Sequence, residues 1–224
     1  MEKAMKVPID PKKARGIYDS LSQIYDYLTL YEGGAKRRGL DAAGIEPGHR
    51  RVLEVGFGTG KILGKILEKN AGGETCGMEL SPRMLRKARR RIAKIDASEG
   101  SHLLVADARH IPFRGGHFEI VFNSYMLDLM DYPVICAVLQ EIKRVLEPGG
   151  HLVLVSLSKG EGWRSNMKAY EWLYGVSPSI FAGCRPLLLE PMVKDAGFCN
   201  IRREFLLAGR IMPSEIIYCE KPVG

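Results

Sequence analysis

The chain has 224 residues, of which 46% are hydrophobic and 26% charged. This is long enough for one sizeable α/β domain and short for two full domains. Its 33 basic and 26 acidic side chains give a formal net charge of +7. That excess suits an anionic partner such as a phospholipid head group, an acidic metabolite or a nucleic acid, but it selects none of them.

Two further features bear on location. No stretch approaches the roughly 20 apolar residues needed to cross a bilayer, and residues 1–16 contain no apolar core of signal-peptide length. The five cysteines include no C-x-x-C pair, which indicates neither a zinc site nor a redox pair. We therefore expect a cytoplasmic protein with reduced thiols and no metal, whose contact with a membrane would be peripheral.

The first segment, about residues 14–45, has the apolar spacing of a helix, and Gly44, Pro47 and Gly48 then break the chain. We expect residues 1–46 to form an N-terminal helical cap on a domain that spans residues 47–224. Basic residues gather at 12–15, at 36–38 and most densely at 83–94.

From Arg51 onward, short apolar strands alternate with amphipathic helices. Strands are expected at about 51–55, 75–80, 102–106, 118–122 and 152–157, and helices over 61–69, 82–95 and 133–147. Pro148-Gly149-Gly150 is expected to end the last of these helices. The basic residues of 83–94 fall mostly on the outer face of their helix, either as a solvated face, which we favour, or as a surface for an anionic partner. Strands buried on both faces and separated by helices predict a parallel sheet.

The alternating pattern changes after Ser158. Residues 160–185 are rich in aromatic side chains, a short helix ends at Gly197, and two strands close the chain at about 201–207 and 211–219. We interpret 160–185 as a helical insertion at the acceptor site; simple packing over the sheet edge is the alternative.

A glycine-rich turn follows the first strand, where ligands of open parallel sheets bind. Gly56, Gly58 and Gly60 let the backbone approach a ligand closely. The spacing does not fit a dinucleotide fingerprint, because Lys61 stands at the third glycine position. It does not fit a P-loop either, because Val55 would have to be glycine.

Acidic residues near the ends of three successive strands suit another ligand. Glu54 precedes the glycines and can face the ammonium of an amino-acid-like group. Glu79, about 20 residues past the loop, can accept both hydroxyls of a ribose, and Asp107 can accept from an adenine amino group. Taken alone, each acid is more often a helix cap or a surface charge; the three together with the glycines indicate S-adenosylmethionine.

Four segments in order carry a resemblance to class I S-adenosylmethionine-dependent methyltransferases, closest to their UbiE-like branch of ubiquinone and menaquinone biosynthesis. They are Val52-Leu53-Glu54-Val55-Gly56-Phe57-Gly58-Thr59-Gly60, Gly77-Met78-Glu79-Leu80-Ser81-Pro82-Arg83-Met84-Leu85, Ala106-Asp107-Ala108-Arg109-His110-Ile111-Pro112-Phe113 and Glu141-Ile142-Lys143-Arg144-Val145-Leu146-Glu147-Pro148-Gly149-Gly150.

The resemblance implies a Rossmann-like, doubly wound α/β fold. Its sheet would be seven-stranded and mostly parallel, with helices on both faces and an antiparallel last strand. It also implies S-adenosyl-L-methionine as the cofactor, S-adenosyl-L-homocysteine as its product, and no metal. The opening Tyr18–Asp26 is similar to the cap of that branch, which would set Tyr18 and Tyr25 over the cofactor; for each a plain core role stays open. The expected cofactor-binding residues are Tyr18, Tyr25, Glu54, Gly56, Gly58, Gly60, Glu79, Leu80, Met84, Asp107, Ala108 and Asn123.

The end of the fourth strand departs from the family pattern. Residues 123–128 read Asn-Ser-Tyr-Met-Leu-Asp, without the arginine–asparagine pair of quinone methyltransferases or the Asn/Asp-Pro-Pro-aromatic motif of amino-group methyltransferases. We take Asn123 and Tyr125 as positioning residues and Asp128 or His110 as candidate bases. For His117, which follows Gly115-Gly116 in an apparent turn, we favour a surface role.

The sequence thus predicts methyl transfer to a small-molecule or lipid acceptor, such as a quinone precursor or a phospholipid head group, with possible peripheral contact to an anionic membrane. Two alternatives stay open: a cofactor-binding protein without catalysis, and a methyltransferase acting on RNA or protein. Nucleic acid is the less favoured partner, and the oligomeric state is not indicated.

Overall fold

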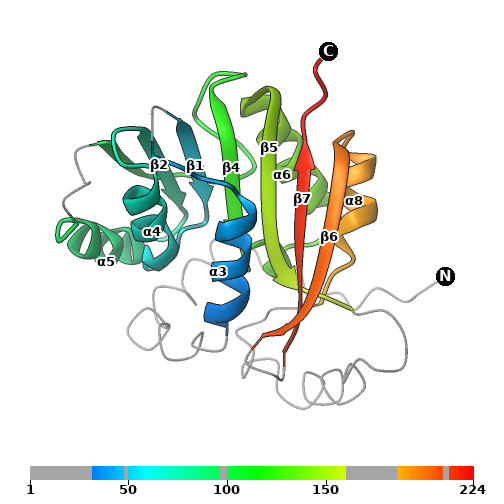
Figure 1. Cartoon of the computed structure of the whole chain (residues 1–224), viewed down its shortest axis with the longest axis horizontal. Coiled ribbons are helices and arrows are strands. Elements are labelled where there is room, and N and C mark those ends of the chain that lie inside the picture. The colour runs from blue at the N-terminus through cyan, green and yellow to red at the C-terminus, as the bar shows by residue number, and fades with distance from the viewer. Residues whose placement is uncertain (1–31, 48–49, 96–99, 160–185, 209–211) are drawn as a thin grey trace.

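Seven strands form one sheet in the computed structural model, which describes residues 32–47, 50–95, 100–159, 186–208 and 212–224 (Figure 1). The spatial order is β3-β2-β1-β4-β5-β7-β6. The strands are β1 (Arg51–Val55), β2 (Glu74–Glu79), β3 (Ser101–Val105), β4 (Phe118–Ser124), β5 (Leu146–Leu157), β6 (Cys199–Ala208) and β7 (Met212–Glu220).

The first five strands are parallel to one another, and β7 lies antiparallel between β5 and β6. This confirms the expected mostly parallel sheet with an antiparallel last strand. Strand order reverses between β1 and β4, because β2 and β3 lie on one side of β1 while β4 and β5 lie on the other. Ligands of doubly wound sheets bind at the carboxyl ends of the strands at such a reversal.

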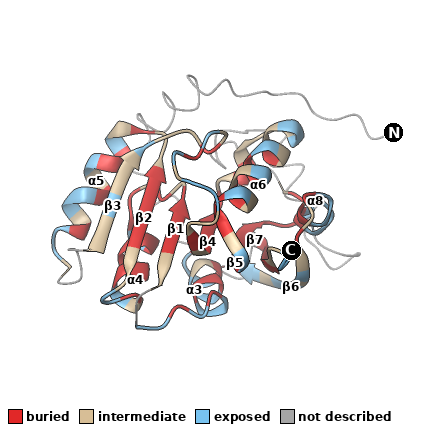
Figure 2. Cartoon of the chain, turned by 90° about the horizontal axis from the view of Figure 1, so that it is seen from above, coloured by how far each residue is buried: buried red, intermediate tan, exposed pale blue. Residues whose placement is uncertain are grey.

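Helices cover both faces of the sheet, as seen from above in Figure 2. On one face lie α3 (Gly33–Ala42), α4 (Lys61–Lys69) and α5 (Pro82–Ile92). The other face carries α6 (Tyr132–Val145) and α8 (Leu189–Asp195). The buried side chains of the strands fill the space between these layers, so the sheet is the centre of the hydrophobic core.

Helix α6 shows how the sequence pattern produces this packing. Its side chains at helical spacing, Ile135, Val138, Leu139, Ile142 and Val145, are fully buried against the sheet. The helix ends at Val145, earlier than the expected stop at Pro148-Gly149-Gly150, and residues 146–150 belong to β5. Pro148 disfavours helical backbone at the residue before it, which is one reason for the earlier end.

Helix α3 corresponds to the last part of the segment expected to be helical over 14–45. Gly44 follows it with φ +58° and ends it as expected. Residues 14–31 lie outside the described part of the chain, as does the expected insertion at 160–185. The division into a cap and a main domain therefore stays a proposal.

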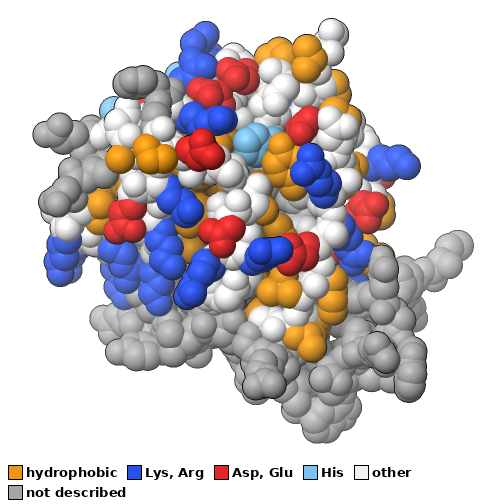
Figure 3. All heavy atoms as spheres, in the orientation of Figure 1, with side chains coloured by type: hydrophobic (Ala, Val, Ile, Leu, Met, Phe, Trp, Pro, Cys, Tyr) orange, Lys and Arg blue, Asp and Glu red, His pale blue; other side chains and the backbone are white. Residues whose placement is uncertain are grey.

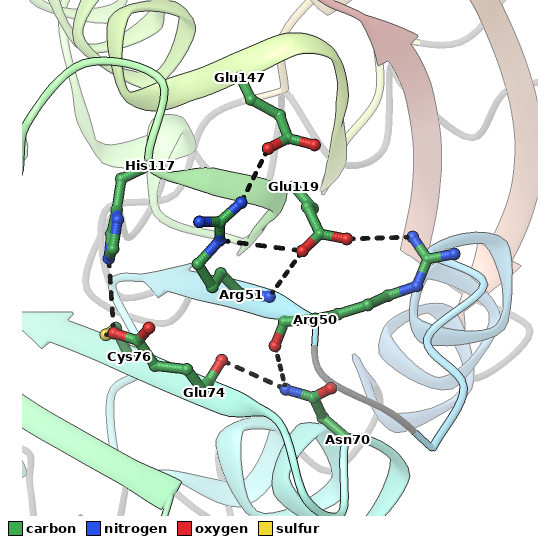
Figure 4. Close-up of polar contacts among 8 residues, drawn as sticks. All are labelled: Arg50, Arg51, Asn70, Glu74, Cys76, His117, Glu119 and Glu147. Atoms are coloured by element: carbon green, nitrogen blue, oxygen red, sulfur yellow. Dashed lines mark hydrogen bonds and ion pairs between the residues drawn. The ribbon is translucent and has the colours of Figure 1, made fainter.

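The amino ends of the strands are tied together by a polar network (Figure 4). Arg51 of β1 donates to Glu147 at 3.0 Å, and its backbone N–H donates to Glu119 of β4 at 3.3 Å. The Asn70 side chain donates to the carbonyls of Arg50 and Glu74 at 3.0 and 3.2 Å. These contacts hold four neighbouring strands in register at the edge opposite the glycine loop.

Over the described ranges, no helix is long and apolar enough to span a membrane. The same residues include no group of three or more His, Cys, Asp or Glu side chains that could hold a metal ion.

Candidate active site

The glycine loop lies at the carboxyl end of β1, where the strand order reverses. Gly56 has φ +75°, and a Cβ there would lie 2.6 Å from Sδ of Met126. Gly60 has φ +77°, and a Cβ there would lie 2.7 Å from Cβ of Ala88 in α5. Both positions therefore need glycine for their backbone conformation and for space. Gly60 is also the N-cap of α4, whose first N–H groups lie at the loop.

Glu79, the last residue of β2, holds this loop in place. Its Oε2 accepts from the N–H of Gly58 at 3.0 Å, and its Oε1 accepts from the N–H of Ser81 at 2.9 Å. A carboxylate has about four acceptor sites, so these two backbone contacts do not by themselves fill it. The side chain that was expected to bind the ligand also shapes the loop that surrounds it.

Glu54 is buried inside the sheet, with 1% of its surface exposed. Among the described residues, its Oε2 has no hydrogen-bond partner. Burial raises the pKa of this carboxyl to about 8, and the positive charge of Lys36 opposes the rise. A buried, unsatisfied acid of this kind suits a cationic group that arrives with a ligand.

Asp107 lies two residues beyond β3, and Arg109 occupies its carboxylate. The guanidinium of Arg109 lies 2.6 Å from Oδ2, and this side-chain hydrogen bond is the main cause of the lowered pKa of Asp107. An adenine amino group would share these oxygens with Arg109. The neighbouring Ala108 is buried, whereas His110 is exposed.

Leu80 and Met84 flank the start of α5. The hydroxyl of Ser81 caps this helix by accepting from the N–H of Met84 at 3.1 Å. Met84 is buried and Leu80 half-buried. Leu80 directly follows Glu79 in the chain. Tyr18 and Tyr25 of that set lie outside the described residues.

The residues at the end of β4 are buried, and their side chains form hydrogen bonds. Asn123 donates to the carbonyl of Val55 at 2.7 Å and so joins β4 to the end of β1. Tyr125 has φ +51°, and its hydroxyl lies 2.8 Å from that of Ser214. This arrangement directs both side chains into the protein and fixes the backbone around the strand-order reversal.

Asp128 is fully buried beside the end of β5. Its carboxylate accepts from the Ser156 hydroxyl and, at 3.2 Å, from the N–H of Leu157. Burial raises its pKa to about 8, although these hydrogen bonds oppose the rise. These contacts suit a residue that fixes the position of β5.

The surface role favoured for His117 is wrong, because this ring is packed at the amino edge of the sheet. It stacks on Phe113 with 6.0 Å between ring centroids, and its Nε2 lies 3.4 Å from Oε1 of Glu74 (Figure 4). Its side chain is 18% exposed. The aromatic neighbours account for the burial, and the edge on which it lies is opposite the glycine loop.

Comparison with known proteins agrees with this geometry. Residues 52–150 match the family model of a methyltransferase domain. The chain is also 33% identical to the ubiquinone/menaquinone biosynthesis C-methyltransferase UbiE of Cupriavidus necator over 223 residues, covering 88% of each chain. The chain belongs to the UbiE-like class I S-adenosylmethionine-dependent methyltransferases.

Solved structures share the fold of this methyltransferase at low identity. The [4+2]-cyclase SpnF matches with a TM-score of 0.77 and 19% identity, covering 97% of this chain and 99% of that one. Phosphoethanolamine N-methyltransferase 2 of Haemonchus contortus, in complex with phosphomonomethylethanolamine and S-adenosylhomocysteine, matches with a TM-score of 0.71 and 17% identity. That match covers 93% of this chain and 60% of the other.

The residues of the UbiE-like site fit the cofactor of the family. The orphaned Oε2 of Glu54 suits an ammonium group, and the carboxylate of Glu79 lies at the end of β2, where the ribose was expected. When bound, S-adenosylmethionine supplies a methyl group already activated by a sulfonium. The protein then has to orient the acceptor and exclude water, and orientation of this kind lowers barriers by roughly 7–11 kcal/mol.

Two contacts in this methyltransferase site were not expected from the sequence. Arg91, counted among the exposed basic residues of its helix, donates to the carbonyl and hydroxyl of Thr59 at 2.7 and 2.9 Å and so ties α5 to the glycine loop. Lys36, placed in a surface basic cluster, turns inward and pairs with Glu32. Arg91 and Thr59 are distant in sequence, so no local pattern predicts their contact, whereas Glu32 and Lys36 have the i,i+4 spacing of a helical ion pair.

Proposed function

We propose that this methyltransferase acts on a small-molecule or lipid acceptor, with an aromatic quinone precursor methylated at a ring carbon as the first candidate. The observation that carries the proposal is the extent of the similarity to a quinone C-methyltransferase, which covers 88% of each chain and so extends on both sides of the cofactor loop. A quinone precursor with ring hydroxyls loses a proton readily. Its methylation therefore requires orientation and modest help from a base.

The described residues indicate which side chains would orient the acceptor and which could act as a base. In our proposal, Asn123 and Tyr125 fix the floor of the acceptor side through their contacts to β1 and β7. Asp128 remains a candidate base, but its full burial and its bonds to Ser156 and Leu157 favour a positioning role. His110, exposed beyond the end of β3, is a candidate base that solvent can reach.

A phospholipid head group is the second candidate acceptor, favoured by the distribution of basic side chains. Arg86 and Arg90 of α5 and Lys61 and Lys65 of α4 are exposed. Lys and Arg side chains gather over the region of these two helices in Figure 3. Such a surface attracts anionic lipid head groups. We propose that this face mediates peripheral contact with membranes and brings the site to a lipid-dissolved acceptor.

The proposal is tested by offering the purified enzyme and methyl-labelled S-adenosylmethionine to a cell extract divided into lipid, small-molecule, RNA and protein fractions. Label should appear in the small-molecule or lipid fraction and should depend on Glu79, with the Glu79→Ala variant as the control. Label confined to RNA or protein would replace the proposed acceptor class. Label in no fraction, with cofactor binding intact, would favour a binding protein without catalysis.

A further inference from the structure

Lys36 of α3 is a cation whose side chain turns inward. Lys36 lies on α3 between the buried Ala35 and the exposed Arg37, and only 16% of its side chain is exposed. Its Nζ lies 2.6 Å from Oε2 of Glu32 and 5.3 Å from the ring centroid of Tyr125. A lysine held by a buried carboxylate and an aromatic face is fixed in position while its ammonium keeps donors to spare.

The ammonium of Lys36 acts on Glu54 through its charge and not through an ion pair. The charge of Lys36 is the largest electrostatic influence on Glu54 apart from burial. No ion pair joins the two residues, both of which belong to the described part of the chain, and Oε2 of Glu54 has no hydrogen-bond partner there. Geometry places the two groups at the same end of the sheet, because Lys36 lies over the ring of Tyr125, which follows Asn123 in the chain. Asn123 pairs with Val55, the neighbour of Glu54. A cationic donor and an anionic acceptor therefore lie near the end of β1 and are not joined to each other.

The amino-acid end of S-adenosylmethionine has the complementary pair of charges on one carbon. Glu54 can accept from its ammonium but would repel its carboxylate, and Lys36 has the opposite preference. We propose that Lys36 binds the α-carboxylate of the cofactor opposite Glu54, with Glu32 and the Tyr125 ring holding the lysine in place. This inference rests on the cofactor site assigned above and adds the group that recognises the carboxylate.

Removing only the carboxylate from the ligand gives a direct test. Decarboxylated S-adenosylmethionine keeps the sulfonium, the nucleoside and the ammonium. Calorimetric titration of the wild-type protein should show S-adenosylmethionine binding at least about tenfold more tightly than the decarboxylated compound, the size expected for one charge-assisted contact. In Lys36→Met that preference should disappear, through loss of S-adenosylmethionine affinity and with decarboxylated-ligand affinity changed less than about twofold.

Two further variants separate recognition from folding. Lys194→Met removes an exposed lysine of α8 and should leave both affinities unchanged. Lys36→Arg keeps the cation and should keep a preference for the carboxylated ligand, and thermal unfolding checks that each variant is folded. Equal weakening toward both ligands in Lys36→Met, or no preference in the wild type, would overturn the role of Lys36. Failure of the wild type to bind either compound would instead overturn the cofactor site itself.

Discussion

Glu54 is the residue on which the chemistry of the site depends most directly. Its pKa of about 8 means that the carboxyl is largely protonated at pH 7 before the cofactor binds. The ammonium of the cofactor favours the charged carboxylate and lowers this pKa. Binding at pH 7 should therefore release a proton, and affinity should increase as the pH rises from 6 to about 8.

We predict that S-adenosylhomocysteine binding at pH 7 releases up to about one proton per site, and that Glu54→Gln abolishes this release. Calorimetry in buffers of different ionisation enthalpy measures the number directly. Because Gln keeps the size of the side chain but cannot ionise, the variant should also lose the pH dependence of affinity between 6 and 8. Proton release that is the same in both proteins would mean that Glu54 does not face the ammonium.

Glu79 combines two tasks, since its carboxylate accepts from the backbone of Gly58 and Ser81 and is expected to accept from the ribose. Glu79→Ala should weaken S-adenosylhomocysteine binding by more than about tenfold, because hydrogen bonds to charged groups contribute about 1.5–3 kcal/mol each. It should also lower the melting temperature by a few degrees, since two loop N–H groups lose their acceptor. Glu68→Ala changes an exposed side chain of α4 and is the matched control. If Glu79→Ala bound the ligand with wild-type affinity, Glu79 would not be the residue that binds the ribose.

The sequence predicted the positions of these acids and glycines because each lies beside a strand with a clear apolar pattern. It did not predict the inward turn of Lys36, whose buried state depends on Glu32 and on Tyr125 from a distant strand end. It also could not distinguish Asp128 as a candidate base from Asp128 as an acceptor for the end of β5. Such outcomes depend on tertiary contacts that no local pattern contains.

At the scale of elements, the junction between α5 and the glycine loop depends on Arg91. The guanidinium of Arg91 joins the last turn of α5 to Thr59, so α5 stabilises the glycine loop that precedes α4. The helical periodicity of α5 was correctly predicted from Leu85, Ala88 and Ile92. The same periodicity could not reveal that one of its arginines serves the loop.

Arg91→Met should lower the free energy of unfolding by about 1–3 kcal/mol, the cost of leaving buried acceptors without a charged donor. It should also weaken S-adenosylhomocysteine binding several-fold by loosening the loop. Arg90→Met, which changes an exposed neighbour on the same helix, should leave both quantities close to wild type. Urea denaturation measures the free energy of unfolding, and calorimetry measures the affinity. If Arg91→Met and Arg90→Met gave the same two values, Arg91 would not stabilise the glycine loop.

The exposed face of α5 allows a separate test of membrane contact. Arg86→Glu/Arg90→Glu should weaken binding to vesicles that contain phosphatidylglycerol by at least about tenfold, because each basic residue near an anionic surface contributes about 1 kcal/mol. Arg114→Glu/Lys194→Glu makes the same change in net charge at exposed sites on other elements and is the control. Cosedimentation at low and high salt measures both. Equal loss in the two double variants would indicate that net charge matters and the α5 face does not.

At the scale of the whole molecule, stability and function occupy opposite edges of the sheet. The amino edge carries the network of Arg51, Glu119 and Glu147, whereas the carboxyl edge carries the glycines and the buried acids. The sequence predicted the number of strands and the parallel arrangement, because hydrophobic pattern and resemblance both indicate them. Where β4 extends past its expected end and where β5 begins depends on pairing between strands, which the sequence pattern does not contain.

The central claim is that this site transfers a methyl group to a small aromatic or lipid acceptor. The most direct measurement supplies methyl-labelled S-adenosylmethionine and a demethylated quinone precursor, with phosphatidylethanolamine vesicles in a parallel reaction, and locates the label by mass spectrometry. The account predicts label on a ring carbon of the quinone precursor, with S-adenosylhomocysteine formed in equal amount. Absence of label from both acceptors, in a protein that binds S-adenosylhomocysteine normally, would contradict it.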